Sequence, residues 1–391
     1  MAEALEADTA RLLGDLIRIP SFSTEEREVV DRIRAEMERI GFDDVRIDGL
    51  GSVIGRIGDG PKTVAFDAHI DTVRTGDESL WTFDPFEGGV VDGMVRGRGA
   101  SDQKGGMASM LAAARIVREI GLAKGLTLLF TGTVMEEDCD GLCWQYLVKE
   151  EGIRPDLVVI TEPTDCRIYR GHRGRMEMTV RAAGLSCHGS DPTRGDNAIY
   201  KGSRIALEIE KLNTRLADDP FLGRGTICAS QFFFTSPSQC AVPDSATVQV
   251  DRRLTAGEDK EKAVEELSDA AARAGVGGAR VEVLRYEEKA YTGLVYGTDK
   301  YYPTWTLPED SPWLLRAREA HREVFDAEAD VGKWVFSTNG VATAGMFGIP
   351  TIGFGPGAEV YAHAPDERIP VRDLSRAAAF YAALAAKAGE A

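Results

Sequence analysis

Residues 63–71, TVAFDAHID, form an apolar run that ends in a histidine and an aspartate. Two similar runs follow, LTLLFTGTVM at 126–135 and DLVVITEP at 156–163. The segments between them, residues 105–122 and 141–152, have the composition and spacing of helices. Near-continuous apolar strands that alternate with helices are typical of a parallel sheet covered on both faces. We therefore predict an α/β fold with a mostly parallel sheet and helices on both faces.

The pattern changes near residue 174, where RMEMTVRA (175–182) alternates like a half-buried strand. A helix, two strands, a second helix and a last strand follow, and βαββαβ is the order of a ferredoxin-like unit. We predict an inserted ferredoxin-like α+β domain at 174–289, which divides the larger domain into residues 1–173 and 290–391. Nearer the N-terminus, Ser23 and Glu26 predict a capping box for a helix that stops at Gly41.

Size and charge limit the possible functions. A chain of 391 residues exceeds the usual size of a single core, so two domains are expected. It has 46 basic and 63 acidic residues, a net charge of -17, which argues against nucleic acid or an anionic membrane as a partner. The sequence shows no apolar leader and no apolar run of membrane-spanning length, so we expect a cytoplasmic protein.

Six scattered cysteines lack any C-x-x-C pair, which indicates neither a disulfide framework nor a zinc knuckle. Cys139 and Cys143 are expected to be small buried side chains, with a redox-sensitive thiol as the alternative. The role of the segment Asp138-Cys139-Asp140 and of Cys143 stays open.

Imidazole and carboxylate groups follow the three central strands. His69 ends the first strand, Glu136 and Glu137 follow the second, and Glu162 follows the third. Ligands of open α/β sheets bind outside the carboxyl ends of the strands, so these groups should share one edge. A solvated acidic loop would also account for two adjacent glutamates in so acidic a chain.

Two further groups favour the functional interpretation. Asp102 lies in GRGASDQKGG just before a helix, and His363 lies in YAHAPDE after the last strand. Histidine nitrogen with carboxylate oxygen suits zinc, cobalt or manganese, and bridging carboxylates can hold two such ions. The cluster would be repulsive without cations.

Five motifs in register carry a family resemblance: HIDTV, GRGASDQKGG, EED, TEP and AHAPDE. They resemble the dizinc amidohydrolase and peptidase family of acetylornithine deacetylase, succinyl-diaminopimelate desuccinylase, aminoacylase and glutamate carboxypeptidase. FDAHIDTV, EEDCDGLCWQY and GHRGRMEM resemble more closely the branch called selenium metabolism-linked hydrolases. The resemblance covers essentially the whole chain, and it implies a zinc-peptidase-like catalytic domain whose inserted domain is a lid that dimerises.

The resemblance implies two divalent metal ions, zinc by preference, with cobalt or manganese possible. His69, Asp102 and Glu162 would bind one ion, and Asp102, Glu137 and His363 the other. Asp71 would orient the His69 ring, and Glu136 would be the general base. The family's cis peptide bond would follow Asp102, but Gln103 departs from the family pattern and leaves that isomer open.

The resemblance also implies substrate contacts. His188, in CHGSDP, would stabilise the oxyanion in the partner subunit's active site, helped by Asn197. Arg253 would bind a substrate carboxylate, while its neighbour Arg252 is expected to be a surface charge. The segments STNG and GFGPG would line the substrate site, with candidate contacts at Asn339, Gly340, Gly355 and Gly357.

These observations predict a homodimeric hydrolase that cleaves an amide-type C–N bond of a small carboxylate-bearing molecule. An N-acyl or N-carbamoyl amino acid, or a dipeptide, fits this description. Two alternatives stay open: a thiol hydrolase that uses Cys139 or Cys187, although no G-x-S-x-G motif is present, and a non-catalytic binding protein on the same fold.

Overall fold

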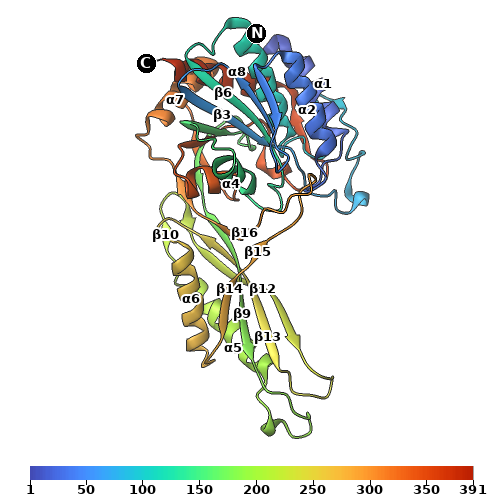
Figure 1. Ribbon diagram of the computed structural model, residues 1–391, viewed down its shortest axis with the longest axis vertical. Coiled ribbons are helices and arrows are strands. Elements are labelled where there is room, and N and C mark those ends of the chain that lie inside the picture. The colour runs from blue at the N-terminus through green and yellow to red at the C-terminus, as the bar shows by residue number, and fades with distance from the viewer. Residues whose placement is uncertain (391) are drawn as a thin grey trace.

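The computed structural model describes residues 1–390 and divides into two lobes (Figure 1). The larger lobe holds both termini, and the smaller one extends away from it beyond β15 (Arg285–Tyr286) and β16 (Thr298–Asp299). Among residues 1–390, no helix combines the length and the apolarity that crossing a membrane requires.

A nine-stranded sheet forms the centre of the larger lobe, in the order β1-β2-β6-β3-β7-β20-β8-β18, with β19 also pairing with β8. The four central strands run parallel, whereas antiparallel pairs lie towards both edges. The bounds are β1 (Asp44–Ile47), β2 (Val53–Ile57), β3 (Lys62–His69), β6 (Leu126–Thr133), β7 (Leu157–Ile160), β8 (Ile168–His172), β18 (Trp305–Thr306), β19 (Val331–Trp334) and β20 (Thr351–Gly353). The predicted α/β fold is confirmed, with parallel pairing confined mainly to its centre.

Helices cover this sheet, as its apolar strands require. They are α1 (Glu6–Ile17), α2 (Arg27–Ile40), α3 (Lys104–Ile120), α4 (Leu142–Lys149), α7 (Pro312–Phe325) and α8 (Val371–Gly389), with a π-helical segment at Val341–Met346. α3 packs against α8, and α1 packs against both. Every residue of β7 is buried, so both faces of the central strands are covered.

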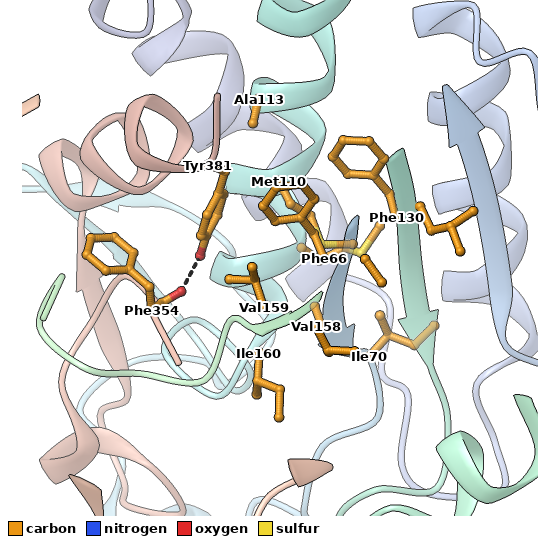
Figure 2. Close-up of a cluster of buried hydrophobic side chains, with 14 of the residues drawn as sticks. Phe66, Ile70, Met110, Ala113, Phe130, Val158, Val159, Ile160, Phe354 and Tyr381 are labelled. Atoms are coloured by element: carbon orange, nitrogen blue, oxygen red, sulfur yellow. Dashed lines mark hydrogen bonds between the residues drawn. The ribbon is translucent and has the colours of Figure 1, made fainter. Parts of the chain in front are cut away.

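The core under α3 and α8 is drawn in Figure 2. Phe66 of β3 stacks on Phe130 of β6 with 5.2 Å between ring centroids. Tyr381 of α8 packs beside Phe66 and donates a 2.7 Å hydrogen bond to the backbone oxygen of Phe354. The phenol therefore buries its ring without leaving its hydroxyl unpaired.

The smaller lobe is a five-stranded antiparallel sheet in the order β12-β13-β9-β14, with β17 also pairing with β9. Its elements are β9 (Gly174–Ala183), α5 (Ala198–Asn213), β12 (Thr226–Thr235), β13 (Ser245–Leu254), α6 (Lys260–Arg273), β14 (Arg280–Val283) and β17 (Tyr301–Tyr302). This is the ferredoxin-like order of strands and helices, and we call this lobe the lid. Two helices pack on the sheet and enclose a separate apolar core.

One local prediction is wrong. Ser23 does not cap α2, whose N-cap residue is Glu26 and has no side-chain capping bond. The Ser23 hydroxyl instead donates a 2.7 Å hydrogen bond to Asp71, and Glu26 accepts from the backbone N–H groups of Thr24 and Met135. A capping pattern in the sequence describes only local partners, whereas both side chains here bind residues distant in the chain. The stop at Gly41 is confirmed, in the left-handed conformation.

Candidate metal centre

Three parallel strands in the centre of the large sheet carry candidate ligands at or just after their carboxyl ends, which lie side by side. β3 lies between β6 and β7, and His69, the last residue of β3, pairs with Thr133, the last residue of β6. Glu136 and Glu137 follow β6, and Glu162 follows β7 by two residues. Parallel pairing therefore brings residues distant in sequence to one place.

Asp102 lies between two histidines. Its Oδ1 is 3.0 Å from Nε2 of His69, and its Oδ2 is 3.4 Å from Nε2 of His363. Glu162 is 3.4 Å from the His69 nitrogen, and Glu137 is 2.8 Å from the His363 nitrogen. Asp102 thus links two groups of potential ligands. The peptide bond that follows it, to Gln103, is cis.

The donor set fits metal ions. The ligand atoms of His69, Glu136 and Glu162 lie within 4.8 Å of one another, and so do those of His69, Asp102 and Glu137. Glu136 Oε1 and Glu162 Oε2 are buried without a hydrogen-bond partner among the described residues. Buried carboxylate oxygens usually have a partner, and oxygen with imidazole nitrogen suits zinc, cobalt or manganese.

The His69 ring is oriented for coordination. Its Nδ1 lies 2.9 Å from the backbone oxygen of Asp71, which can only accept, so Nδ1 carries a proton and Nε2, which faces the carboxylates, is the nitrogen that could bind a metal ion. The Asp71 carboxylate, expected to be the partner of this ring, is farther away, with Oδ1 at 3.5 Å from Nδ1. Its two oxygens also accept the backbone N–H groups of Glu136 and Glu137.

A tight turn separates β6 from these glutamates. Met135 has a φ of 61°, in the left-handed region that a non-glycine residue rarely adopts. The Asp71 carboxylate holds the next two residues of the turn through their N–H groups. Adjacent side chains of a regular strand would point to opposite faces. The turn instead lets both glutamates approach the histidines.

Burial and crowding change the acidity of the cluster. Burial, aided by the charge of Asp102, raises the pKa of Glu162 to about 8 and that of Glu137 to about 7. Burial also raises the pKa of Glu136 well above its ordinary value. The hydrogen bond to Glu137 raises the pKa of His363 to about 9. A divalent cation would relieve this repulsion among carboxylates.

The cluster opens into a cavity of about 730 Å³ between the lobes. Arg253 of β13 reaches this cavity from the lid, and its guanidinium also pairs with Asp251 at 2.8 Å. The other lining residues are Asp102, Glu136, Glu137, Asp140, Glu162, Arg175, Val335, Phe336, Ser337, Glu359, Val360, Ala362 and His363. The cavity therefore combines the carboxylate cluster with two arginines and an apolar wall.

Other candidate substrate residues lie elsewhere in the single chain. The Asn197 side chain caps α5 by accepting from Ile199 and Tyr200, and His188 is on the lid surface with Nδ1 2.7 Å from Ser190 Oγ. Asn339 is buried, and its amide binds Asp67, Thr133, Gly141 and Cys143. None of these three lines the cavity.

The candidate glycines have packing roles in the structure. A Cβ on Gly355 would lie 2.1 Å from the backbone oxygen of Glu162, and one on Gly340 would meet the Trp305 ring. Gly357 has a φ of 78° and lies beside Ser101. These glycines permit close approach of the chain near the site, and none of the three is among the residues that line the cavity.

Arg252 corrects a prediction, because it is buried rather than a surface charge. It shares a face of β13 with the buried residues Val250 and Leu254, which lie two residues to either side. Its guanidinium donates to Glu258 at 2.6 Å and to Glu266 at 3.1 Å. These carboxylates compensate its charge, and the sequence alone did not reveal them.

Asp140 and Arg175 also line the cavity, and neither was predicted from the sequence to have a role there, whereas Ser337 belongs to the predicted STNG segment. Asp140 follows the glutamates, lies 3.3 Å from the guanidinium of Arg175 on β9, and accepts a hydrogen bond from Ser337. The unexplained acidic segment after Glu137 was the signal for Asp140. Arg175 lies in β9, where polar and apolar residues alternate. Nothing in that pattern separates it from an ordinary surface arginine, so the sequence held no signal for its place in the cavity.

The thiols beside the site are protonated. Cys139 and Cys143 are buried, as expected. Burial raises the pKa of Cys139 to about 12 and that of Cys143 well above its ordinary value. Such thiols are poor nucleophiles.

Comparisons with known proteins agree on one family of hydrolases. The model of "Peptidase family M20/M25/M40" matches residues 65–387. The chain is 52% identical over 383 residues to the protein YgeY of Escherichia coli (strain K12), covering 98% of this chain and 95% of that protein. It is 30% identical over 267 residues to succinyl-diaminopimelate desuccinylase of Rhodospirillum centenum, covering 63% of this chain and 68% of that enzyme.

Solved structures share the fold. Aminopeptidase PepT from Bacillus cereus superposes with a TM-score of 0.74 at 20% identity, over 98% of this chain and 99% of that one. The YXEP protein of Bacillus subtilis, described as a dinuclear metal binding peptidase, superposes with a TM-score of 0.73 at 17% identity, over 98% of each chain.

Proposed function

The chain belongs to peptidase family M20/M25/M40, and on that premise we propose that it is a two-metal hydrolase of an amide-type C–N bond. Its substrate is a small molecule with a free carboxylate: an N-acyl or N-carbamoyl amino acid, or a dipeptide. The observation that carries this proposal is the position of Asp102, 3.0 Å from the His69 nitrogen and 3.4 Å from the His363 nitrogen. A carboxylate between two imidazoles suits a bridge between two cations.

In this proposal His69, Asp102 and Glu162 hold one ion, and Asp102, Glu137 and His363 hold the other. Zinc is the first choice, with cobalt or manganese as alternatives. When bound, such ions act as Lewis acids and make a water molecule acidic enough to lose a proton near neutral pH.

Glu136 is the proposed general base. Its Oε2 is 3.8 Å from the His69 nitrogen, and its Oε1 is buried without a protein partner, facing no competing donor. It accepts the proton of the attacking water and returns it to the leaving nitrogen. Asp71 supports this role by holding the backbone of the Glu136–Glu137 turn.

Arg253 is proposed to bind the substrate carboxylate. It lines the same cavity as the cluster, and a guanidinium recognises a carboxylate through two parallel hydrogen bonds. His188 and Asn197 are proposed to act in the partner subunit's cavity, because neither lines the cavity of its own chain. This arrangement requires a homodimer formed through the lid.

The thiol alternative is opposed by the raised pKa of Cys139, and Cys187 does not line the cavity. A non-catalytic role is opposed by the two groups of potential ligands that share His69, and by His363, which lies 3.4 Å from Asp102 and 2.8 Å from Glu137.

The testing experiment measures metal content by mass spectrometry, together with hydrolysis of N-acetyl, N-succinyl and N-carbamoyl amino acids and dipeptides. Two ions per chain and metal-dependent cleavage are expected. Glu136→Gln should keep the metal and lose about 10²–10⁴-fold in kcat, the usual contribution of a general base. Arg253→Ala should raise KM for carboxylate substrates. Wild-type turnover by Glu136→Gln, or a chain without metal after reconstitution, would contradict the proposal.

A further inference from the structure

The segment after His363 runs alongside the loop that carries Asp102. β21 (Arg368–Pro370) pairs with β5 (Met94–Arg96), and the pairing continues through a 2.9 Å hydrogen bond from the Gly97 N–H to the backbone oxygen of Glu367. Glu367 therefore lies beside the point where the loop of residues 97–102 leaves the paired strands β5 and β21. It stands four residues after His363.

The Glu367 carboxylate is buried and occupied on both oxygens. Oε1 accepts the backbone N–H groups of Ser101 at 2.8 Å and Asp102 at 2.9 Å. Oε2 accepts the Gly99 N–H at 2.9 Å and the guanidinium of buried Arg98 at 2.7 Å. Four donors from one short loop thus converge on a single carboxylate, and bonds to an ionised acceptor are the stronger kind.

The residue before Glu367 is also held in place. The neighbouring Asp366 accepts from the backbone N–H of Thr82 at 2.7 Å and from its hydroxyl at 2.9 Å. The Glu367 side chain connects the Asp102 backbone directly to the chain that bears His363. Neither Arg98 nor Glu367 lines the cavity, so neither touches a substrate there.

We infer that Glu367, clamped by Arg98, is a positioning residue that sets the Asp102 carboxylate against His363. This inference rests on the proposed two-metal site. A glutamine at this position would present an amide NH₂ to at least one backbone N–H, and a donor facing a donor cannot hold the loop. Asp102 would keep its side chain but lose its fixed place between the two histidines.

The test is a titration of metal-free protein with Zn²⁺ in competition with a chromogenic chelator. The variants are Glu367→Gln and a control, Asp48→Asn. Asp48 is also buried and accepts two turn N–H groups, from Gly51 at 2.6 Å and Ser52 at 2.9 Å, but its side chain bonds no residue of the metal centre. Circular dichroism and thermal midpoints of the metal-free proteins record folding and stability.

Glu367→Gln is expected to bind Zn²⁺ about 10–100-fold more weakly, the usual cost of removing a group that supports metal ligands. Asp48→Asn should bind Zn²⁺ as tightly as the wild type does, even if its thermal midpoint falls as much as that of Glu367→Gln. Unchanged affinity in Glu367→Gln, or an equal loss in both variants, would overturn the inference while leaving the metal site in place. A wild-type chain that binds no Zn²⁺ would overturn the proposed function and the inference together.

A second variant covers a failure of Glu367→Gln to fold. Arg98→Lys keeps the positive charge and leaves the three backbone bonds of the carboxylate, but replaces the planar guanidinium. A measurable weakening of Zn²⁺ binding in this folded variant supports the inference, and wild-type affinity would overturn it.

Discussion

At the scale of single residues, His172 illustrates a histidine held neutral by its partners. Its Nε2 accepts the indole N–H of Trp305 at 2.8 Å and the backbone N–H of Thr338 at 3.1 Å. Its Nδ1 lies 2.9 Å from the backbone oxygen of Arg173, which requires a proton there. A second proton on the ring would face two donors, so only the neutral form fits.

This geometry predicts a pH dependence of stability. Burial lowers the pKa of His172 from 6.5 to about 4, although the carbonyl of Arg173 and the charge of Asp140 oppose the shift. Between these values the unfolded chain binds more protons than the folded one, so the free energy of unfolding falls as the pH falls from 6.5 to 4. Over this range the shift in the pKa of His172 should lower the free energy of unfolding by about 3 kcal/mol.

The measurement is urea unfolding at several pH values, with a chelator present so that metal release does not contribute. His172→Gln should be less stable at pH 7, and the stability advantage of the wild type should shrink towards pH 4. An advantage that stays constant across this range would show that His172 does not titrate as proposed.

Residues also differ in how far the sequence could predict them. His69, Asp102, Glu137, Glu162 and His363 could be grouped because strand ends and turns place them, and these features have sequence signals. The structure brings them together; their roles as ligands stay predictions. Arg252 could not be placed, because its burial depends on Glu258 and Glu266 across the lid core. Asn339 could not either, since its four partners come from three other segments.

At the scale of elements, α3 owes its position to its small residues. Gly106 faces the segment after β7, where an added Cβ would lie 2.2 Å from Oγ1 and 2.8 Å from the backbone oxygen of Thr161. Thr161 directly precedes Glu162 and itself bonds Asp67 and Gln103. The helix and the metal-centre segment therefore approach too closely for any side chain at this position.

Gly106→Ala should accordingly lower the free energy of unfolding by about 1–3 kcal/mol, the usual cost of overpacking, despite the better helix propensity of alanine. Gly389→Ala is the matched control near the end of α8, because its Cβ would meet only Leu126 at 3.6 Å. Urea unfolding of both variants checks this expectation. Equal stability of the two would show that α3 can move away without cost.

Elements were more predictable than the connections between them. Periodicity placed β3, β6 and β7 and the helices between them, because it reports burial of a face. The turn at Met135 was not predictable, because its left-handed backbone is held by contacts distant in the chain. Glu26 accepts the N–H of Met135, 109 residues away, and Asp71 accepts the N–H of Glu136, 65 residues away. The same long-range contacts explain why the capping box at Ser23 failed.

At the scale of the whole molecule, the lid presents an apolar edge. β12 is the edge strand of its sheet, and Phe232, Phe233 and Phe234 are 40%, 52% and 57% exposed. α5 packs against β12 and exposes Tyr200 and Leu207. A long apolar edge strand invites pairing with another chain. This exposed edge supports the proposed homodimer, in which the lid of a second copy of this chain would cover it.

A charge on this edge should separate the subunits. Phe233→Lys is expected to shift the molar mass measured by light scattering from dimer to monomer, because lysine on an edge strand opposes pairing. The variant should still bind metal, since β12 contributes no residue to the cavity. Its kcat should fall if His188 acts in the partner subunit. A dimeric Phe233→Lys, or a fully active monomer, would contradict this arrangement.

Mixing two inactive variants tests the exchange of His188 directly. Glu136→Gln removes the proposed base from its own cavity, and His188→Ala removes the proposed donor from the partner's cavity. If the subunits are denatured together and refolded, half of the dimers are mixed, and one of the two sites in each has both groups intact. About a quarter of all sites should then regain activity. Refolding each variant alone should restore nothing. Should the mixture stay inactive while mixed dimers form, His188 would have to act within its own chain or not at all, because only a contribution across the dimer predicts recovery.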